Sequence, residues 1–240
     1  MTRLSVFAGP TLAPRRIAGV DWYGPAAAGD LLQLGNARPH AVLLIDGLFG
    51  TARAPWHKEV LVLLANGFEV FGAASIGALR AAELLPFGMR PVGAIARAYC
   101  DGRIIGDDEV AVAHAPADLD YRALSVAHVD VRATLLAARR RRLMSENAAR
   151  ALLAASRRIH FTERSWADVV RSAEHVCGTE AASWIAAHAL PYKQLDAEAA
   201  LALVMGRPPQ PSNCAPPPET IFLRRLRDQI AGRSPLTPRS

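Results

Sequence analysis

Ser75 lies where a buried apolar run gives way to a helix, in the stretch VFGAASIGALRAAE (Val70 to Glu83). A hydroxyl at such a turn can cap the helix, bind an anion or attack a carbonyl carbon. As a nucleophile, Ser75 would use the backbone N–H of Ile76 to stabilise the oxyanion, and Gly77 would keep the turn tight. The arrangement is similar to a nucleophile elbow, with Ala73 in place of the usual first glycine. The helix cap is the commonest of the three roles, and the local sequence leaves all of them open.

A serine nucleophile needs a base, and the segment WHKE (Trp56 to Glu59) supplies two candidates, His57 and Lys58. The helix that this segment opens is apolar almost all round, so at least one of the two side chains should point inward. A lysine that is partly desolvated near a helix N-terminus holds its proton less tightly and can act as a base. The spacing does not choose between His57 and Lys58, and both could be surface residues while Glu59 supports the first turn.

Three further residues could assist at an anionic centre. Arg80 follows Ser75 on the same predicted helix, where it could add positive potential or pair with Glu83 at i+3. Gly9 and Thr11 follow the first apolar run and could offer a second oxyanion donor. An ordinary Gly-Pro turn is the alternative for these two residues.

Three short apolar runs predict buried strands, over residues 4–9, 41–47 and 68–74. Helix-length segments separate them, which favours a parallel sheet. The predicted fold class is therefore α/β, with a parallel sheet core covered by helices and a helical C-terminal region. Ligands of such sheets bind at the carboxyl ends of the strands, where the turn at Ser75 would lie. A further strand is predicted over residues 107–116, where larger and smaller apolar residues alternate.

The pattern changes near residue 120 from alternating strands and helices to successive helices. We expect four parts: an α/β core over residues 1–120, a helical region over 121–206, a proline-rich tether over 207–218, and a short basic helix and tail over 219–240. Two helices of the helical region should meet near Ser145 and Glu146.

Composition narrows the classes of function. The formal net charge of +6 allows an anionic partner, but the arginines fall on predicted helix faces. No helix-turn-helix or aromatic-interleaved basic strand is present, so nucleic acid is not an expected partner. Three cysteines without a Cys-x-x-Cys pair disfavour a disulfide framework and a cysteine-rich zinc site. The sequence has no signal-peptide pattern and no stretch near the ~20 apolar residues of a membrane span, so we expect a soluble, cytoplasmic chain.

Six short motifs, in a fixed order over roughly the first half of the chain, carry a family resemblance. They are GPTL (9–12), IDGLF (45–49), WHKE (56–59), GAASIGALRAAEL (72–84), FGM (87–89) and DDEVAVAH (107–114). In these motifs and their order the chain resembles the TfuA-like family.

The resemblance implies a partner of YcaO enzymes in peptide backbone thioamidation. The YcaO enzyme uses ATP to activate an amide oxygen of its precursor peptide, and the TfuA-like protein supplies sulfide by hydrolysing a thiocarboxylated ThiS-like sulfur-carrier protein. The family uses a Ser–Lys pair, which implies Ser75 as nucleophile and Lys58 as base, with no metal or cofactor. Many relatives carry two adjacent serines where this chain has Ala74 and Ser75. The second is taken as the reactive one because it lies closest to the helix start.

Three alternatives remain open. The chain could be a non-catalytic adaptor that brings the sulfur carrier and the peptide to the YcaO enzyme. The carboxylates of Asp107 to Glu109, with His114, could bind a metal, although neighbouring residues on a strand point to opposite faces and a solvated turn is the simpler interpretation. Nucleotide binding at the glycine-rich turn is disfavoured because the usual phosphate-binding motifs are missing.

Overall fold

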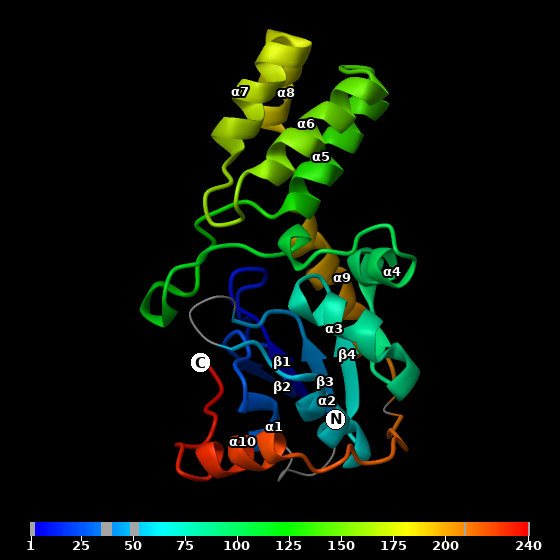
Figure 1. Ribbon diagram of the computed structural model, residues 1–240, viewed down its shortest axis with the longest axis vertical. Helices are drawn as coiled ribbons and strands as arrows, with labels where there is room; N and C mark the ends of the chain where they lie inside the picture. Colours follow the sequence, from blue (N-terminus) through cyan, green and yellow to red (C-terminus); the bar gives the residue numbers. More distant parts are fainter. Residues whose placement is uncertain (1–2, 35–39, 49–52, 209, 240) are drawn as a thin grey trace. The chain divides into compact units, whose positions relative to one another are not determined.

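The core of the protein is a five-stranded parallel sheet, which confirms the predicted α/β class (Figure 1). The computed structural model describes residues 3–34, 40–48, 53–208 and 210–239. The strands lie in the order β2-β1-β3-β4-β5 and comprise β1 (Leu4–Phe7), β2 (Val20–Tyr23), β3 (Ala41–Leu44), β4 (Glu69–Gly72) and β5 (Arg90–Pro91). The apolar runs predict β1, β3 and β4. They miss β2, which is only half buried, and β5, which has two residues.

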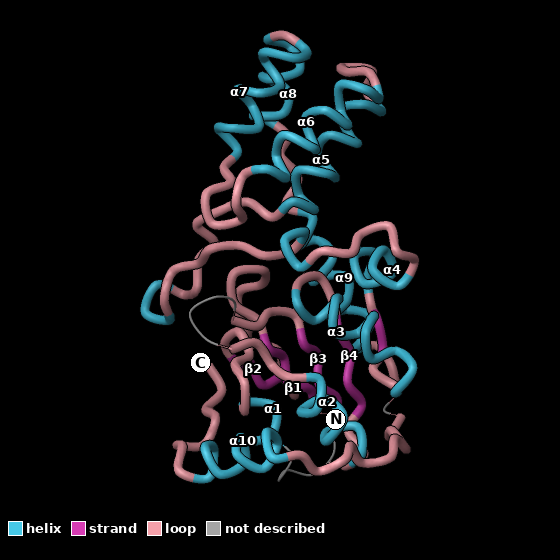
Figure 2. Tube along the Cα trace, viewed as in Figure 1, coloured by secondary structure: helices cyan, strands magenta, loops and turns pink. Residues whose placement is uncertain are grey.

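Helices cover both faces of this sheet, as Figure 2 shows for the strands and the helices around them. On one face lie α1 (Asp30–Leu34), α2 (His57–Ala65) and α3 (Ile76–Leu84), which share a buried cluster with β1, β3 and β4. On the other face α9 (Tyr192–Met205) packs against β1, β3 and β4. The sequence pattern does not predict α9, because its apolar side chains are spread almost all round the helix axis.

The chain forms two compact units, one of residues 1–105 with 196–240 and one of residues 106–195. The second unit contains four helices with a buried apolar core of their own: α5 (His128–Arg140), α6 (Glu146–Arg158), α7 (Trp166–Cys177) and α8 (Thr179–Ala187). The join between α5 and α6 falls at Ser145, as predicted. The predicted boundaries lie near residues 120 and 206, whereas the chain passes from one unit to the other after residue 105 and after residue 195. The second of these positions lies within α9, so most of that helix belongs to the unit that contains the sheet.

The strand predicted over residues 107–116 is wrong. Asp107–Glu109 form a short 3-10 helix, η2, and His114 makes only an isolated bridge with Ala123. The Glu109 side chain is buried and meets His128 Nδ1 at 3.0 Å and Arg132 Nη2 at 2.6 Å. These contacts come from residues that are distant in sequence, so the local alternation of side chains does not reveal them. Within the described part of the chain no three acidic, histidine or cysteine side chains are grouped as metal ligands.

The remaining helices are short or peripheral. They are α4 (Gly93–Cys100), the 3-10 helices η1 (Leu85–Phe87) and η3 (Ala117–Leu119), and α10 (Ile221–Ala231). The predicted tether has no helix or strand over residues 210–219, and α10 matches the predicted basic helix. Figure 1 shows α10 beside α1, and Leu223 and Leu226 pack with Ala28 and Leu32. Among the described helices, none combines the length and apolar character that crossing a bilayer requires.

Candidate functional site

The turn at Ser75 joins the carboxyl end of β4 to the first residue of α3. The backbone N–H of Ser75 donates to the Ala73 carbonyl oxygen at 2.7 Å, which closes a three-residue turn around Ala74. Ala74 has a φ of 59°, in the left-handed region that non-glycine residues rarely adopt. Strained backbone of this kind is concentrated at functional sites. The strain falls on Ala74, one position before the hydroxyl.

The Ser75 side chain does not cap α3. Ser75 occupies the N-cap position and is 4% exposed, but its hydroxyl makes no cap hydrogen bond. Ser145 and Ser165, by contrast, each accept a backbone N–H at the start of their own helices. The commonest explanation for a serine at this position, a helix cap, therefore does not apply to Ser75.

Gly72 and Gly77 have no side chains, which allows the first turn of α3 to pack directly against the sheet backbone. A Cβ added at Gly77 would overlap the Leu44 carbonyl group, and one added at Gly72 would overlap the carbonyl of Gly77. The Gly77 N–H donates to the Ile45 carbonyl oxygen at 3.0 Å, so it is not open to a ligand. The Ile76 N–H makes no hydrogen bond within the described part of the chain. The predicted donor, the Ile76 N–H, is therefore without an acceptor among the described residues.

Gly9 and Thr11 are bound to a carboxylate that the sequence interpretation overlooks. Asp46 Oδ2 accepts the N–H of Gly9 at 2.9 Å and that of Thr11 at 3.0 Å, and Asp46 Oδ1 accepts the Thr11 hydroxyl at 2.6 Å. Both N–H groups thus have an acceptor and do not form the predicted second oxyanion donor in this structure. Asp46 follows β3 and the bound loop follows β1, the pair of strands where the sheet order reverses and open α/β sheets bind ligands. An aspartate two residues after a buried strand is the signal that could have identified it.

The candidate base Lys58 contacts the C-terminal segment. Its Nζ donates to the Thr220 hydroxyl at 3.0 Å and to the Pro218 carbonyl oxygen at 3.1 Å. Thr220 in turn caps α10 by accepting the Leu223 N–H. No hydrogen bond links Lys58 to Ser75 among the described residues. The proposed base and the proposed nucleophile are therefore not in hydrogen-bond contact in this structure.

His57 and Arg80 meet on a different carboxylate. Glu83 Oε2 lies 2.8 Å from His57 Nε2 and 2.6 Å from Arg80 Nη1, and Arg80 Nε also donates to the Pro55 carbonyl. The pairing of Arg80 with Glu83, one of its two predicted roles, is the one observed. The sequence predicts that at least one of His57 and Lys58 points inward. His57 is exposed, so it is not the residue that does so.

Glu59 fixes the start of α2 next to Lys58. Its side chain is fully buried and accepts the N–H of Trp56 at 2.9 Å and that of Gly29 at 2.8 Å. Burial raises the pKa of Glu59 to about 7, although the two backbone N–H groups oppose the rise. The expected supporting role of Glu59 in the first helical turn is therefore what the structure shows.

A family comparison identifies the chain. A model of the family described as TfuA-like protein matches residues 46–165, half of the sequence. The chain belongs to the TfuA-like family. A search of curated proteins found no match. The matched segment of this TfuA-like protein begins at Asp46 and contains Lys58 and Ser75, whereas Gly9 and Thr11 precede it. Of the motif IDGLF, its last residue, Phe49, lies outside the described residues.

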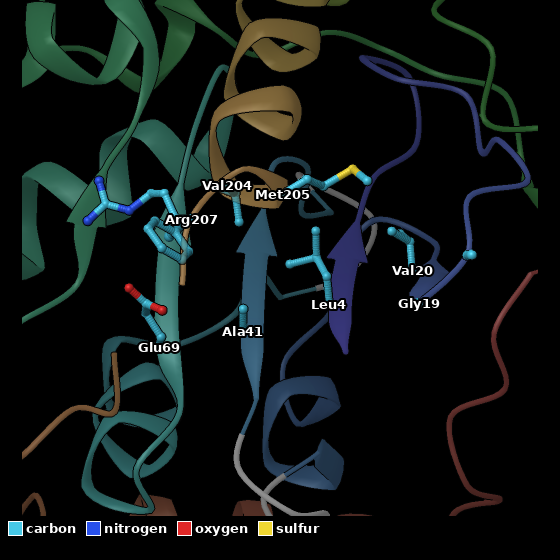
Figure 3. A pocket seen from close by; sticks show the side chains of 10 residues that line it. Leu4, Gly19, Val20, Ala41, Glu69, Val204, Met205 and Arg207 are labelled. Atoms are coloured by element: carbon cyan, nitrogen blue, oxygen red, sulfur yellow. The ribbon is translucent and has the colours of Figure 1, made fainter. Parts of the chain in front are cut away.

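A pocket of about 200 Å³ lies at the other end of the sheet of this TfuA-like protein (Figure 3). Its lining includes Leu4, Ala41 and Glu69, the first residues of β1, β3 and β4. Ser75 follows the opposite, carboxyl end of β4. This pocket is therefore separate from the turn at Ser75.

Proposed function

We propose that this TfuA-like protein hydrolyses a thiocarboxylated ThiS-like sulfur-carrier protein and delivers the sulfide to a YcaO enzyme, which thioamidates a precursor peptide. The observation that carries the proposal is the Ser75 hydroxyl at a strained turn, which makes no cap hydrogen bond, beside the Ile76 N–H, which has no acceptor among the described residues. Membership of the TfuA-like family supports the partnership with a YcaO enzyme.

The chemistry follows from these groups. Ser75 Oγ attacks the thiocarboxylate carbon, and the Ile76 N–H stabilises the negative charge that develops on the oxygen. The C–S bond breaks, hydrosulfide leaves, and an ester of the carrier with Ser75 remains. Water then attacks that ester, so the carrier departs as an ordinary carboxylate and the hydroxyl is restored.

Lys58 is the proposed base for the Ser75 proton. A base must come within hydrogen-bond reach of the proton that it takes, and hydrogen bonds of this kind often form only in the substrate complex. The Lys58 amine must therefore exchange its present acceptors, Pro218 and Thr220, for the serine hydroxyl. The C-terminal segment would then compete with catalysis for the same amine.

The decisive experiment is incubation with a thiocarboxylated carrier while sulfide is measured. We expect Ser75→Ala to reduce sulfide release at least about a thousandfold, as loss of a nucleophile does, with little change in stability because no cap is lost. The matched control is Ser145→Ala, which removes a real cap and should cost about 1 kcal/mol of stability while sulfide release is retained. Equal sulfide release by wild type and Ser75→Ala would overturn the proposal.

A second pair of variants tests the base. Lys58→Met should abolish most of the activity, whereas His57→Ala should keep it, because His57 is exposed and pairs with Glu83. Ala74→Ser, which introduces the first of the two adjacent serines found in many relatives, should not rescue Ser75→Ala. Rescue would move the nucleophile to position 74, where the positive φ lies.

The engaged state of Lys58 favours one alternative, a non-catalytic adaptor that recruits the sulfur carrier and the peptide to the YcaO enzyme. An adaptor needs neither a free amine nor a reactive hydroxyl. In a reconstituted thioamidation reaction, the adaptor would keep its effect after Ser75→Ala, and the hydrolase would lose it.

A further inference from the structure

The first turn of α10 presents two large apolar side chains to solvent. Ile221 is 64% exposed and its neighbour Phe222 is 67% exposed. The helix lies outside the segment that matches the family, so the matched motifs do not account for these residues. A single exposed apolar side chain is ordinary, but neighbouring large ones, one of them aromatic, form the kind of patch that marks an interaction site.

The exposure does not come from a loosely attached helix. Leu223 and Leu226, on the opposite side of α10, are buried in an apolar cluster, and Trp56 at the start of α2 packs against the same cluster. Thr220 caps the helix by accepting the Leu223 N–H. One side of α10 is therefore anchored to the sheet unit, while the two apolar side chains of its first turn have no such packing.

The same helix carries an excess of positive charge. Its arginines are Arg224, Arg225 and Arg227, all exposed, and Asp228 is its one acidic residue. Arg227 pairs with Glu219 at 2.7 Å, whereas the side chains of Arg224 and Arg225 form no ion pair with any residue that the structure describes. A partner that covers this helix must therefore supply carboxylates as well as an apolar contact.

This surface adjoins the proposed base. Thr220, the residue before Ile221, accepts a hydrogen bond from Lys58 Nζ at 3.0 Å. A sulfur carrier whose thiocarboxylate reaches the Lys58 amine must pass the first turn of α10. The body of a carrier protein is much larger than its reacting end, so it covers the residues beside the amine. This continuity with the amine selects the carrier as the occupant of the surface.

The exposed face of α10 consists of Ile221, Phe222, Arg224 and Arg225. We propose that this face is the docking surface for the sulfur carrier, and that it binds an acidic surface with an apolar centre on that protein. The inference rests on the proposed function, which brings the carrier to Lys58. In such an interface an aromatic side chain supplies much of the affinity, and the arginines supply orientation and a fast encounter.

The first test is the double variant Ile221→Ser with Phe222→Ser. Both side chains are exposed, so the melting temperature should match that of the wild type. The KM for the thiocarboxylated carrier should rise about tenfold with kcat unchanged, because the variant loses binding and no reacting group. The Kd for the carrier in its ordinary carboxylate form, measured by titration calorimetry, should rise by a similar factor.

The matched control is Leu85→Ser with Phe87→Ser on η1. These residues are also an exposed apolar pair of the sheet unit, at 48% and 52%. This control should leave both the KM and the Kd for the carrier unchanged.

The second test reverses the charge of the face, with Arg224→Glu and Arg225→Glu. The Kd for the carrier should rise about tenfold at low salt, and the difference from the wild type should shrink at about 0.5 M salt, where exposed charges are screened. A difference that does not depend on salt would mean that the partner surface is not acidic, and would overturn that part of the proposal.

Carrier binding and sulfide release separate this inference from the proposed function. A wild type that binds the carrier but releases no sulfide means that the proposed function fails, and the Kd values of the variants then still test the docking surface. A wild type that does neither overturns both.

Unchanged Kd and KM in the apolar variant would overturn the docking surface. The same holds if that variant keeps its affinity for the carrier but loses self-association in sedimentation, or loses binding to phosphatidylserine vesicles. The face would then belong to a second copy of the chain or to a membrane.

Discussion

The turn at Ser75 depends on a glycine that has no room for a side chain. Gly77 in the first turn of α3 lies against the Leu44 carbonyl group, which is part of the sheet backbone and cannot move aside. The absent side chain therefore sets how closely the helix, and with it the Ser75 hydroxyl, approaches the carboxyl end of the sheet.

We expect Gly77→Ala to lower the free energy of unfolding by about 3 kcal/mol or more, because the added methyl must displace backbone. The control is Gly232→Ala, where an added Cβ meets nothing within 4 Å, and its effect should stay within about 0.5 kcal/mol. Urea unfolding of both variants measures the difference. Equal stability of the two would show that α3 can move off the sheet.

Individual residues also show what sequence can and cannot predict about the site. Ser75 is predictable because a strand, small residues and a helix follow one another locally. The acceptors of Lys58 lie about 160 positions away, at Pro218 and Thr220, so no local pattern indicates them.

At the scale of elements, the sequence predicts correctly the strands that form continuous buried runs and the helices that have caps or an apolar face. The core strands β1, β3 and β4 are buried at every position and mostly apolar, and α5 to α8 show caps or apolar faces. The predicted strand over residues 107–116 fails in a segment where the buried Glu109 side chain makes tertiary contacts that the local pattern does not reveal. Its partners His128, Arg132 and Arg157 come from two later helices.

The Glu109 cluster should hold η2, α5 and α6 together. Burial alone would raise the pKa of Glu109, but hydrogen bonds from His128 and Arg132, with their charges, outweigh it and lower the pKa to about 2. A lowered pKa means stability that is present above the ordinary value of 4.5 and is lost as the pH falls toward 2.

Glu109→Gln should therefore cost about 3 kcal/mol at pH 7, because it replaces the buried charge that pairs with Arg132 by a neutral amide. The cost should shrink at pH 3, where the wild type is itself losing the interaction. Urea unfolding at the two pH values measures both. A cost that is the same at pH 3 and pH 7 would mean that shape, and not charge, explains the effect.

At the scale of the whole molecule, carboxylates whose pKa values are shifted in opposite directions shape the response of stability to pH. Glu59 in the sheet unit and Asp130 in the helical unit have raised pKa values, of about 7 and about 6, through burial. The pKa of Glu109 is instead lowered, to about 2. A raised value means that the folded protein holds the proton more tightly than the unfolded chain does, so folding is favoured at low pH and loses stability as the pH rises.

Stability should consequently be greatest near pH 4 to 5 and decline toward neutral pH, and Glu59 should account for a measurable share of that decline. Between its ordinary value of 4.5 and about 7, the burial of the Glu59 charge should cost about 3 kcal/mol. Glu59→Gln cannot ionise, so the difference in unfolding free energy between wild type and variant should move in favour of the variant from pH 5 to pH 7.5. Asp130 is the same in both proteins and cancels from that difference. A difference that stays constant over this interval would show that Glu59 is ionised without penalty, and that the first turn of α2, where Lys58 lies, is more open to water than its burial indicates.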